Sequence, residues 1–143
     1  MIPVDQTRFH DPEGKSPPGN CWAACLASIL EFRLEDVPDL ADYWTPDASA
    51  AKVWNAYYDA TIAWLAKQNL GFVEAHFDQY NRDLTDNAWC LIAGPSPRYP
   101  VFHSVVGRNF EVVHDPHPSR AGLAGERREW LFGYVVLLDP ARR

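Results

Sequence analysis

Cys21 stands at a point in the chain where a thiol can act as a nucleophile. It follows Gly19, a turn former, and Asn20, a good N-cap residue, and apolar side chains then recur at the helical period. The pattern predicts a buried helix over about 21–32 that begins at Cys21. The unpaired N–H groups and the positive end of such a helix favour the thiolate, which is the reactive form of cysteine. On a helical wheel Cys21 lies at the edge of the apolar stripe, where a cleft can meet it.

The other two cysteines are predicted to be packing residues. Cys25 lies inside the apolar stripe of the same helix, and Cys90 lies in the apolar run 88–93, which is typical of a buried strand. A redox pair of Cys21 and Cys25 is disfavoured because a helix aims their Cβ atoms poorly for a disulfide bridge. Three cysteines at this spacing also fit neither a disulfide framework nor a zinc site.

A thiol nucleophile needs a base, and the base needs an acid that orients it. His103 opens a predicted strand over 102–108, and Asp115 closes the next one over 110–114. A hairpin that sets His103 opposite Asp115 puts both side chains on one face, with Cβ atoms about 5 Å apart. A hairpin that sets His103 opposite His114 instead puts Asp115 on the other face. Both registers remain open, so a triad with Cys, His and Asp is a hypothesis here.

A metal site is an alternative for the same part of the chain. Its ligands would be His103, His114, Asp115 and His117. The step from His114 to His117 across an Asp-Pro pair matches no familiar zinc spacing, and no cysteine lies nearby in sequence. We therefore expect neither a metal nor another cofactor. The remaining histidines are expected at the surface: His10 and His76.

The elements that must position these residues form an α+β pattern with the helices first. A longer second helix is predicted over about 46–68, because 45–47 (Thr-Pro-Asp) can start it and 69–71 (Asn-Leu-Gly) can end it. After Gly71 the apolar residues change to short runs that predict strands. This order favours helices packed on an antiparallel meander of about four or five strands. The predicted strands are 72–77, 88–93, 102–108, 110–114 and 134–138.

Length, composition and charge limit the class of protein. A chain of 143 residues with six Trp, six Tyr and seven Phe predicts a single domain over 1–143 with a substantial core. The net charge of −6 argues against nucleic acid or a membrane surface as the partner, because phosphate groups bind to basic surfaces. It favours a peptide or protein substrate of basic or neutral character. No secretory signal and no apolar run of membrane length is visible, so a reducing cytoplasm is the expected compartment.

Residues 19–25, Gly-Asn-Cys-Trp-Ala-Ala-Cys, resemble the nucleophile block of the papain-like cysteine peptidases, in which a Trp often follows the Cys. In layout nearly the whole chain is similar to the bacterial peptidases that remove double-glycine leaders from bacteriocins, and to their stand-alone relatives. Those peptidases have a Gln upstream, a Cys that opens a helix, a His and an Asp-Pro. The residues in that order here are Gln6, Cys21, His103 and Asp115-Pro116.

The resemblance implies a papain-like fold and acyl transfer. Cys21 would attack a carbonyl, His103 would protonate the leaving group, and Asp115 would hold the His103 tautomer. One departure concerns the oxyanion hole, because Gln6 stands much farther before Cys21 than its counterpart does in those peptidases. Asn20 is the alternative donor beside the backbone N–H of Cys21.

The order Cys, His, Asp leaves the reaction class open. A bacterial or phage peptidase or isopeptidase is the first hypothesis. A thiol acyltransferase or deamidase is the second, because transglutaminases and arylamine acetyltransferases use the same order on related folds. A binding module that has kept the fold without catalysis is the third.

Overall fold

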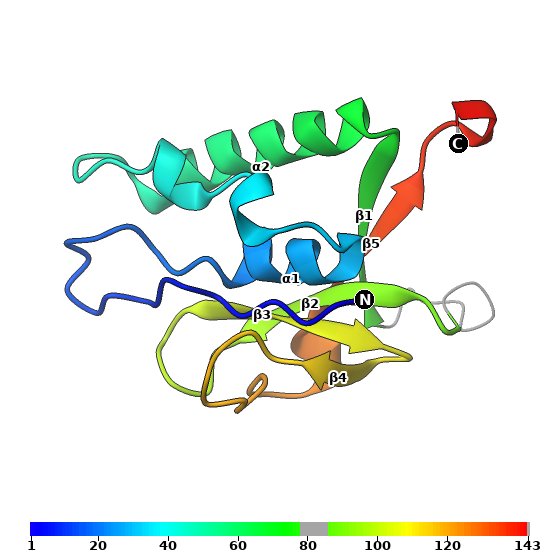
Figure 1. The fold of residues 1–143 in the computed structure, drawn as a ribbon. Helices are drawn as coiled ribbons and strands as arrows, with labels where there is room; N and C mark the ends of the chain where they lie inside the picture. Colours follow the sequence, from blue (N-terminus) through cyan, green and yellow to red (C-terminus); the bar gives the residue numbers. More distant parts are fainter. Residues whose placement is uncertain (78–85, 143) are drawn as a thin grey trace.

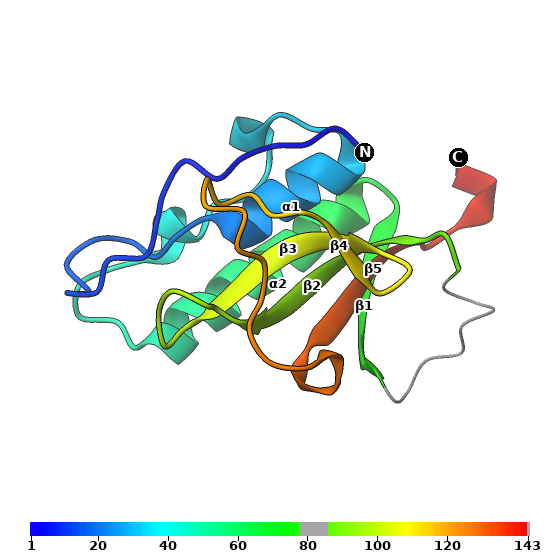
Figure 2. The ribbon, with the colours of Figure 1, turned by 90° about the horizontal axis from the view of Figure 1, so that it is seen from below.

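The computed structural model describes residues 1–77 and 86–142, and it places the helices on one face of a five-stranded antiparallel sheet (Figures 1 and 2). The predicted α+β class is confirmed at this level. The α-helices are α1 (Cys21–Leu30) and α2 (Ala50–Lys67). The strands are β1 (Leu70–His76), β2 (Trp89–Pro95), β3 (Phe102–Arg108), β4 (Glu111–His114) and β5 (Leu131–Leu137). Short 3₁₀ turns are η1 (Leu34–Asp36), η2 (Leu40–Tyr43), η4 (Arg127–Glu129) and η5 (Pro140–Arg142).

The order of the strands differs from a simple meander. Across the sheet the strands run β1-β5-β2-β3-β4, so the last strand in sequence lies between the first two. Only β2, β3 and β4 follow one another as predicted. Strand periodicity gives no information on which strands are neighbours, and β5 pairs with both β1 and β2.

Helix α1 begins at Cys21 as predicted but is two residues shorter than the expected 21–32. Glu31 has a left-handed backbone with φ 59°, and its N–H bonds to the carbonyl of Ala27. The N–H of Phe32 bonds to the same carbonyl at 3.0 Å, which ends the helix. The small residues Ala23, Ala24 and Ala27 are buried and allow α1 to lie close over β3 and β2.

Helix α2 begins at Ala50, later than the predicted residue 46. Ser49 caps it, with the Ser49 hydroxyl accepting from the N–H of Lys52 at 3.3 Å. The Thr-Pro-Asp start signal at 45–47 instead forms a turn, in which the N–H of Ala48 bonds to the Thr45 carbonyl at 3.1 Å. The sequence signal of a capping residue followed by a proline therefore marks a turn here, and the helix starts only after that turn.

Strand β5 begins at Leu131, three residues before the predicted start of the last strand at 134. Gly133 interrupts the apolar run in the sequence, yet it lies inside the strand opposite Glu74. A Cβ atom at this position would clash with the ring of Phe72 on β1. The glycine is therefore a point of close packing and not a strand breaker.

The β3–β4 hairpin has neither of the two registers considered from the sequence. Asn109 and Phe110 form its tight turn with φ 52° and 65°, and Arg108 pairs with Glu111. A bulge then shifts the ladder between Gly107 and Val106, so that Val106 pairs with His114. Extra residues in a bulge leave no clear mark in the sequence.

Two apolar clusters hold the layers together. One contains residues of both helices and of the sheet, among them Trp22, Leu26, Tyr57, Leu91 and Val106. The other comes from the sheet strands and the β3–β4 turn and includes Cys90, Ile92, Val105, Phe110 and Phe132. None of the helices in the described ranges has the length and apolar character that a membrane crossing requires.

Candidate active site

His103 and Asp115 meet despite the shifted register. His103 lies near the start of β3, and Asp115 lies one residue beyond the end of β4. Their side chains are 5% and 3% exposed, and Nε2 of His103 lies 2.7 Å from Oδ1 of Asp115. The structure thus brings the predicted base and acid into direct contact.

This contact shapes the charges of both groups. Burial by itself lowers the pKa of His103, but the hydrogen bonds to Asp115 and Cys21 outweigh it and raise the pKa to about 9. Burial by itself raises the pKa of Asp115, but the bond from His103 and two backbone N–H groups lower it to about 2. Both shifts favour an imidazolium and a carboxylate at neutral pH, so Nε2 of His103 donates to Asp115.

Cys21 completes the arrangement from the other side of the ring. It is partly exposed at the first position of α1 and lines the same cleft as His103, and its interaction with the imidazole is one of the causes that raise the pKa of His103. Because Nε2 is engaged with Asp115, the atom left for the thiol is Nδ1. Cys25 and Cys90 are buried, as predicted. Burial raises the pKa of Cys25 far above its usual range and that of Cys90 to about 11, so both thiols stay neutral.

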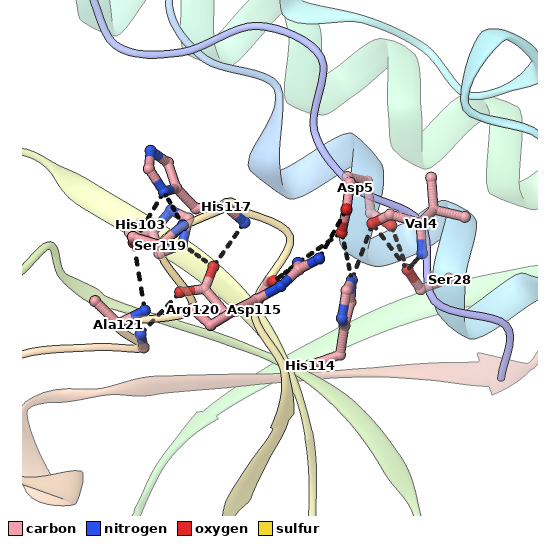
Figure 3. A network of polar contacts seen from close by, with 12 residues as sticks. Val4, Asp5, Ser28, His103, His114, Asp115, His117, Ser119, Arg120 and Ala121 are labelled. Atoms are coloured by element: carbon pink, nitrogen blue, oxygen red, sulfur yellow. Dashed lines mark hydrogen bonds and ion pairs between the residues drawn. The ribbon is translucent and has the colours of Figure 1, made fainter.

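Asp115 is held by a loop that the sequence does not point to. The N–H of His117 donates to Oδ1 at 2.8 Å, and the N–H of Gly122 donates to Oδ2 at 2.8 Å. Gly122 has φ 70°, a backbone conformation that suits glycine. The Arg120 guanidinium donates to the Asp115 carbonyl, as Figure 3 shows, and Nη1 of Arg98 lies 4.0 Å from Oδ2. The loop fixes the carboxylate in position and direction.

The N-terminal segment is attached to this same loop. The N–H of Gln6 donates to the Pro116 carbonyl at 3.1 Å. The guanidinium of Arg120 binds both carboxylate oxygens of Asp5, at 2.6 and 2.8 Å (Figure 3). These contacts carry Gln6 to the cleft in which Cys21 lies.

Asn20 closes the insertion between Gln6 and the helix. Its N–H donates to the carbonyl of Arg8 at 3.2 Å, and its Oδ1 accepts from the N–H groups of Thr7 and Arg8 at 3.1 and 3.0 Å. Its Nδ2 reaches Thr7 Oγ1 at 3.1 Å and Asp39 Oδ2 at 3.5 Å. The side chain does not cap α1. Its whole amide group is used to fasten the segment around residues 7 and 8.

Gln6 lines the same cleft as Cys21 and is 6% exposed. Its Nε2 donates to the Arg8 carbonyl at 2.8 Å, and its Oε1 is buried without a hydrogen-bond partner among residues 1–77 and 86–142. A Cβ atom on Gly19 would lie 3.4 Å from Nε2 of Gln6. The amide is therefore packed against the residues that lead into α1.

The histidines of the alternative metal set have separate partners. Nε2 of His114 lies 3.1 Å from the Val4 carbonyl (Figure 3), and Nδ1 of His117 accepts from the N–H of Ser119 at 3.0 Å. Within residues 1–77 and 86–142, no three side chains of metal-ligating type come together. His10 differs from its predicted surface position, because it is partly buried, lines the cleft and packs its ring 5.0 Å from that of Tyr99. His76 is exposed, as predicted.

The cleft has a volume of about 950 Å³ and contains Cys21 and His103. On the helix side the wall of the cleft is apolar and largely aromatic, with Trp22, Trp44, Val53, Trp54 and Tyr58. On the sheet side the β2–β3 connection supplies polar and charged groups from Ser96, Arg98 and Tyr99.

No protein-family model matches the chain, and no curated protein and no solved structure matches it either.

Proposed function

We propose that this protein is a thiol hydrolase, a peptidase or isopeptidase, that works through an acyl-enzyme on Cys21. The observation that carries the proposal is the 2.7 Å contact between Nε2 of His103 and Oδ1 of Asp115 in the cleft that Cys21 also lines, where the thiol interacts with His103. A histidine with its pKa raised to about 9 is an imidazolium at neutral pH, which can pair with a Cys21 thiolate and hold the proton that the leaving amine later takes. Burial of His103 and Asp115 beside a large open cleft supports the same reading.

In the first half of the reaction, Sγ of Cys21 as thiolate forms a bond to the substrate carbonyl carbon. The carbonyl oxygen becomes an oxyanion, which the N–H of Cys21 at the start of α1 can stabilise. The proton on Nδ1 of His103 then passes to the leaving amine as the carbon–nitrogen bond breaks. In the second half, His103 takes a proton from water, which attacks the thioester and releases Cys21.

We assign the second oxyanion donor to Gln6 and a positioning role to Asn20. Gln6 lies in the cleft, and Nε2 has one hydrogen left after its bond to the Arg8 carbonyl. Asn20 has no free amide hydrogen, because Thr7 and Asp39 take both. Its bonds keep the N-terminal segment, and with it Gln6, against the start of α1.

We further propose that the arrangement of α1, the sheet and the Asp115 loop is papain-like. The helix that starts at the cysteine lies over β2 and β3, and β3 carries the histidine. All three cysteines are free. A thiol nucleophile with two buried free thiols suits a reducing compartment such as the cytoplasm.

The test is alkylation by iodoacetamide followed by peptide mass mapping. We expect Cys21 to react well below pH 8 while Cys25 and Cys90 remain unmodified, and we expect His103→Ala to slow the reaction of Cys21 at least tenfold. His76→Ala is the matched control, because this histidine is exposed on β1. Equal and slow modification of the three cysteines would contradict the proposal.

A further inference from the structure

One wall of the cleft is an aromatic cluster that starts at the residue after the nucleophile. The ring of Trp22 lies 5.8 Å from that of Trp54 and 6.2 Å from that of Tyr58, both on α2. The ring of Phe72 on β1 lies 5.5 Å from Trp22 on another side. Trp54 is 39% exposed, so part of this wall is open to a ligand.

A single acid belongs to this wall. Glu74 and Phe72 alternate with Val73 along β1, so they face the same side of the sheet, toward Trp22. Helix α2 contacts β1 on this side, and Figure 1 shows β1 running away from the C-terminal end of the helix at a large angle. Burial raises the pKa of Glu74, and burial followed by the charges of Glu74 and Asp59 raises the pKa of Tyr58. Glu74 thus lies at the exposed edge of the cleft, close enough to Tyr58 for its charge to act on the phenol.

The charges of the cleft are separated along its length. Glu74 is the one carboxylate among the described residues that line the cleft. The cationic lining residue Arg98 lies on the β2–β3 connection, and its guanidinium donates to Ser119 at 2.8 Å beside Asp115. The end of the cleft formed by α2 and β1 therefore has aromatic faces and a negative charge, while the other end has a positive charge.

We propose that the α2–β1 end of the cleft, formed by Trp54, Tyr58 and Glu74, is a specificity pocket for a lysine or arginine side chain of the substrate. An arginine or lysine has an apolar stem that can cover aromatic rings and a cationic head that can pair with a carboxylate. An acidic side chain would meet Glu74 as a like charge, and an apolar one would leave the carboxylate without a partner. Trp22 follows Cys21 directly in the chain, and its ring packs against Trp54 and Tyr58 of this pocket. The basic side chain of the substrate therefore lies within a few residues of the scissile bond.

This inference rests on the proposed function only for its assignment of a peptide substrate, and it can be tested without turnover. The Cys21→Ala variant is titrated with N-acetylated, C-amidated hexapeptides that differ only by arginine, norleucine or glutamate at one position, scanned along the peptide. Binding is measured by calorimetry and by the fluorescence of the tryptophans. At one or two positions we expect arginine to bind about tenfold more tightly than norleucine, and glutamate to bind most weakly.

The pocket residue is tested by Glu74→Gln, which keeps the shape and removes the charge. It should reduce the preference for arginine to about twofold or less, and Glu74→Lys should reverse it in favour of glutamate. Asp86→Asn is the matched control, because Asp86 is an exposed acid outside the cleft lining, and it should leave the preference unchanged. Equal affinity for the three peptides at every position, or an arginine preference that survives in Glu74→Gln, would overturn the inference.

The proposed function is judged separately, by the alkylation of Cys21 and by hydrolysis of the same peptides with the unmodified protein. Binding selectivity without hydrolysis would leave the pocket in place and remove the hydrolase. Hydrolysis without selectivity for a basic residue would support the hydrolase and overturn the pocket.

Discussion

Nε2 of His103 lies 2.7 Å from Oδ1 of Asp115, although no backbone ladder pairs the two residues. The bulge between Gly107 and Val106 shifts β4, and Asp115 leaves the strand one residue after His114. The carboxylate is then held by the N–H groups of His117 and Gly122. The contact therefore depends on the loop after β4 more than on the pairing of the strands.

Asp115→Asn should lower kcat/KM by about a hundredfold or more, because an amide can hold His103 in the wrong tautomer. The buried site loses a charge-assisted bond as well. The measurement is the hydrolysis rate of a peptide substrate across pH. Asp36→Asn, in an exposed 3₁₀ turn, is the control and should be neutral. An Asp115→Asn variant with full activity would remove Asp115 from the mechanism.

His103 should make the stability of the fold depend on pH above neutrality. Its pKa is raised from 6.5 to about 9 in the folded chain, so the native state holds the proton more tightly than the unfolded chain does. This stabilisation is complete below about pH 6.5 and is lost as the pH rises to about 9. Urea unfolding at pH 6 and pH 9.5 should show a loss for the unmodified protein on the order of 1 to 3 kcal/mol larger than for His103→Gln. Parallel losses in the two proteins would contradict the raised pKa.

Asp115 should produce the opposite dependence in acid. Its pKa is lowered to about 2 from an ordinary value of 3.8, so its stabilisation is present above pH 4 and is lost as the pH falls toward 2. Unfolding midpoints of the unmodified protein and of Asp115→Asn should therefore converge between pH 4 and pH 2. The measurement is urea unfolding followed by circular dichroism, and midpoints that stay apart down to pH 2 would refute it.

Gln6→Ala should lower kcat by about tenfold to a hundredfold with little change in KM, because an oxyanion donor acts in the transition state. The rate of Cys21 alkylation should stay nearly unchanged, since the thiol and His103 are untouched. Gln68→Ala, at the C-terminal end of α2, is the control. A rise in KM with a fall in kcat and slower alkylation would instead indicate that Gln6 only supports the fold.

Arg120→Gln should loosen the N-terminal segment without unfolding the domain. Arg120 joins Asp5 to the carbonyl of Asp115, and an exposed ion pair of this kind adds little to global stability. We expect faster amide hydrogen exchange at residues 5–8 and a several-fold lower kcat/KM. Arg33→Gln breaks a comparable exposed pair with Asp36 far from the cleft and should change neither.

The local elements could be predicted from the sequence, whereas several long-range contacts could not. The spacing of apolar residues after Cys21 gave the start of α1, and the run 102–108 gave the bounds of β3. The position of β5 between β1 and β2 depends on packing such as Phe72 over Gly133, which no periodicity records. The start of α2 depends on whether the chain turns at Thr45 before Ser49.

For the candidate site, residue types were predictable and the contacts that hold them were not. Cys21, His103 and Asp115 stand out because the sequence places a nucleophile at a helix start, a base on a strand and an acid after the next strand. Arg120 and Gly122 act through a bound carbonyl and a backbone N–H, so their side-chain types give little signal. Glu74 is an exposed acid on a strand, and its place in the cleft lining depends on how α2 and β1 pack together.

Arg8 and Asn20 are joined by backbone and side-chain hydrogen bonds, so the chain between them forms an Ω-shaped excursion with a closed neck. The tip of this excursion is organised by Asp11, whose carboxylate accepts from the N–H groups of Glu13 and Lys15 at 2.9 Å. Because Arg8 and Asn20 are bonded to each other, the position of Cys21 does not depend on how many residues the loop between them contains. Residues 12–16 therefore form a natural graft point, at which an epitope or a fluorescent label can be inserted while the nucleophile keeps its place.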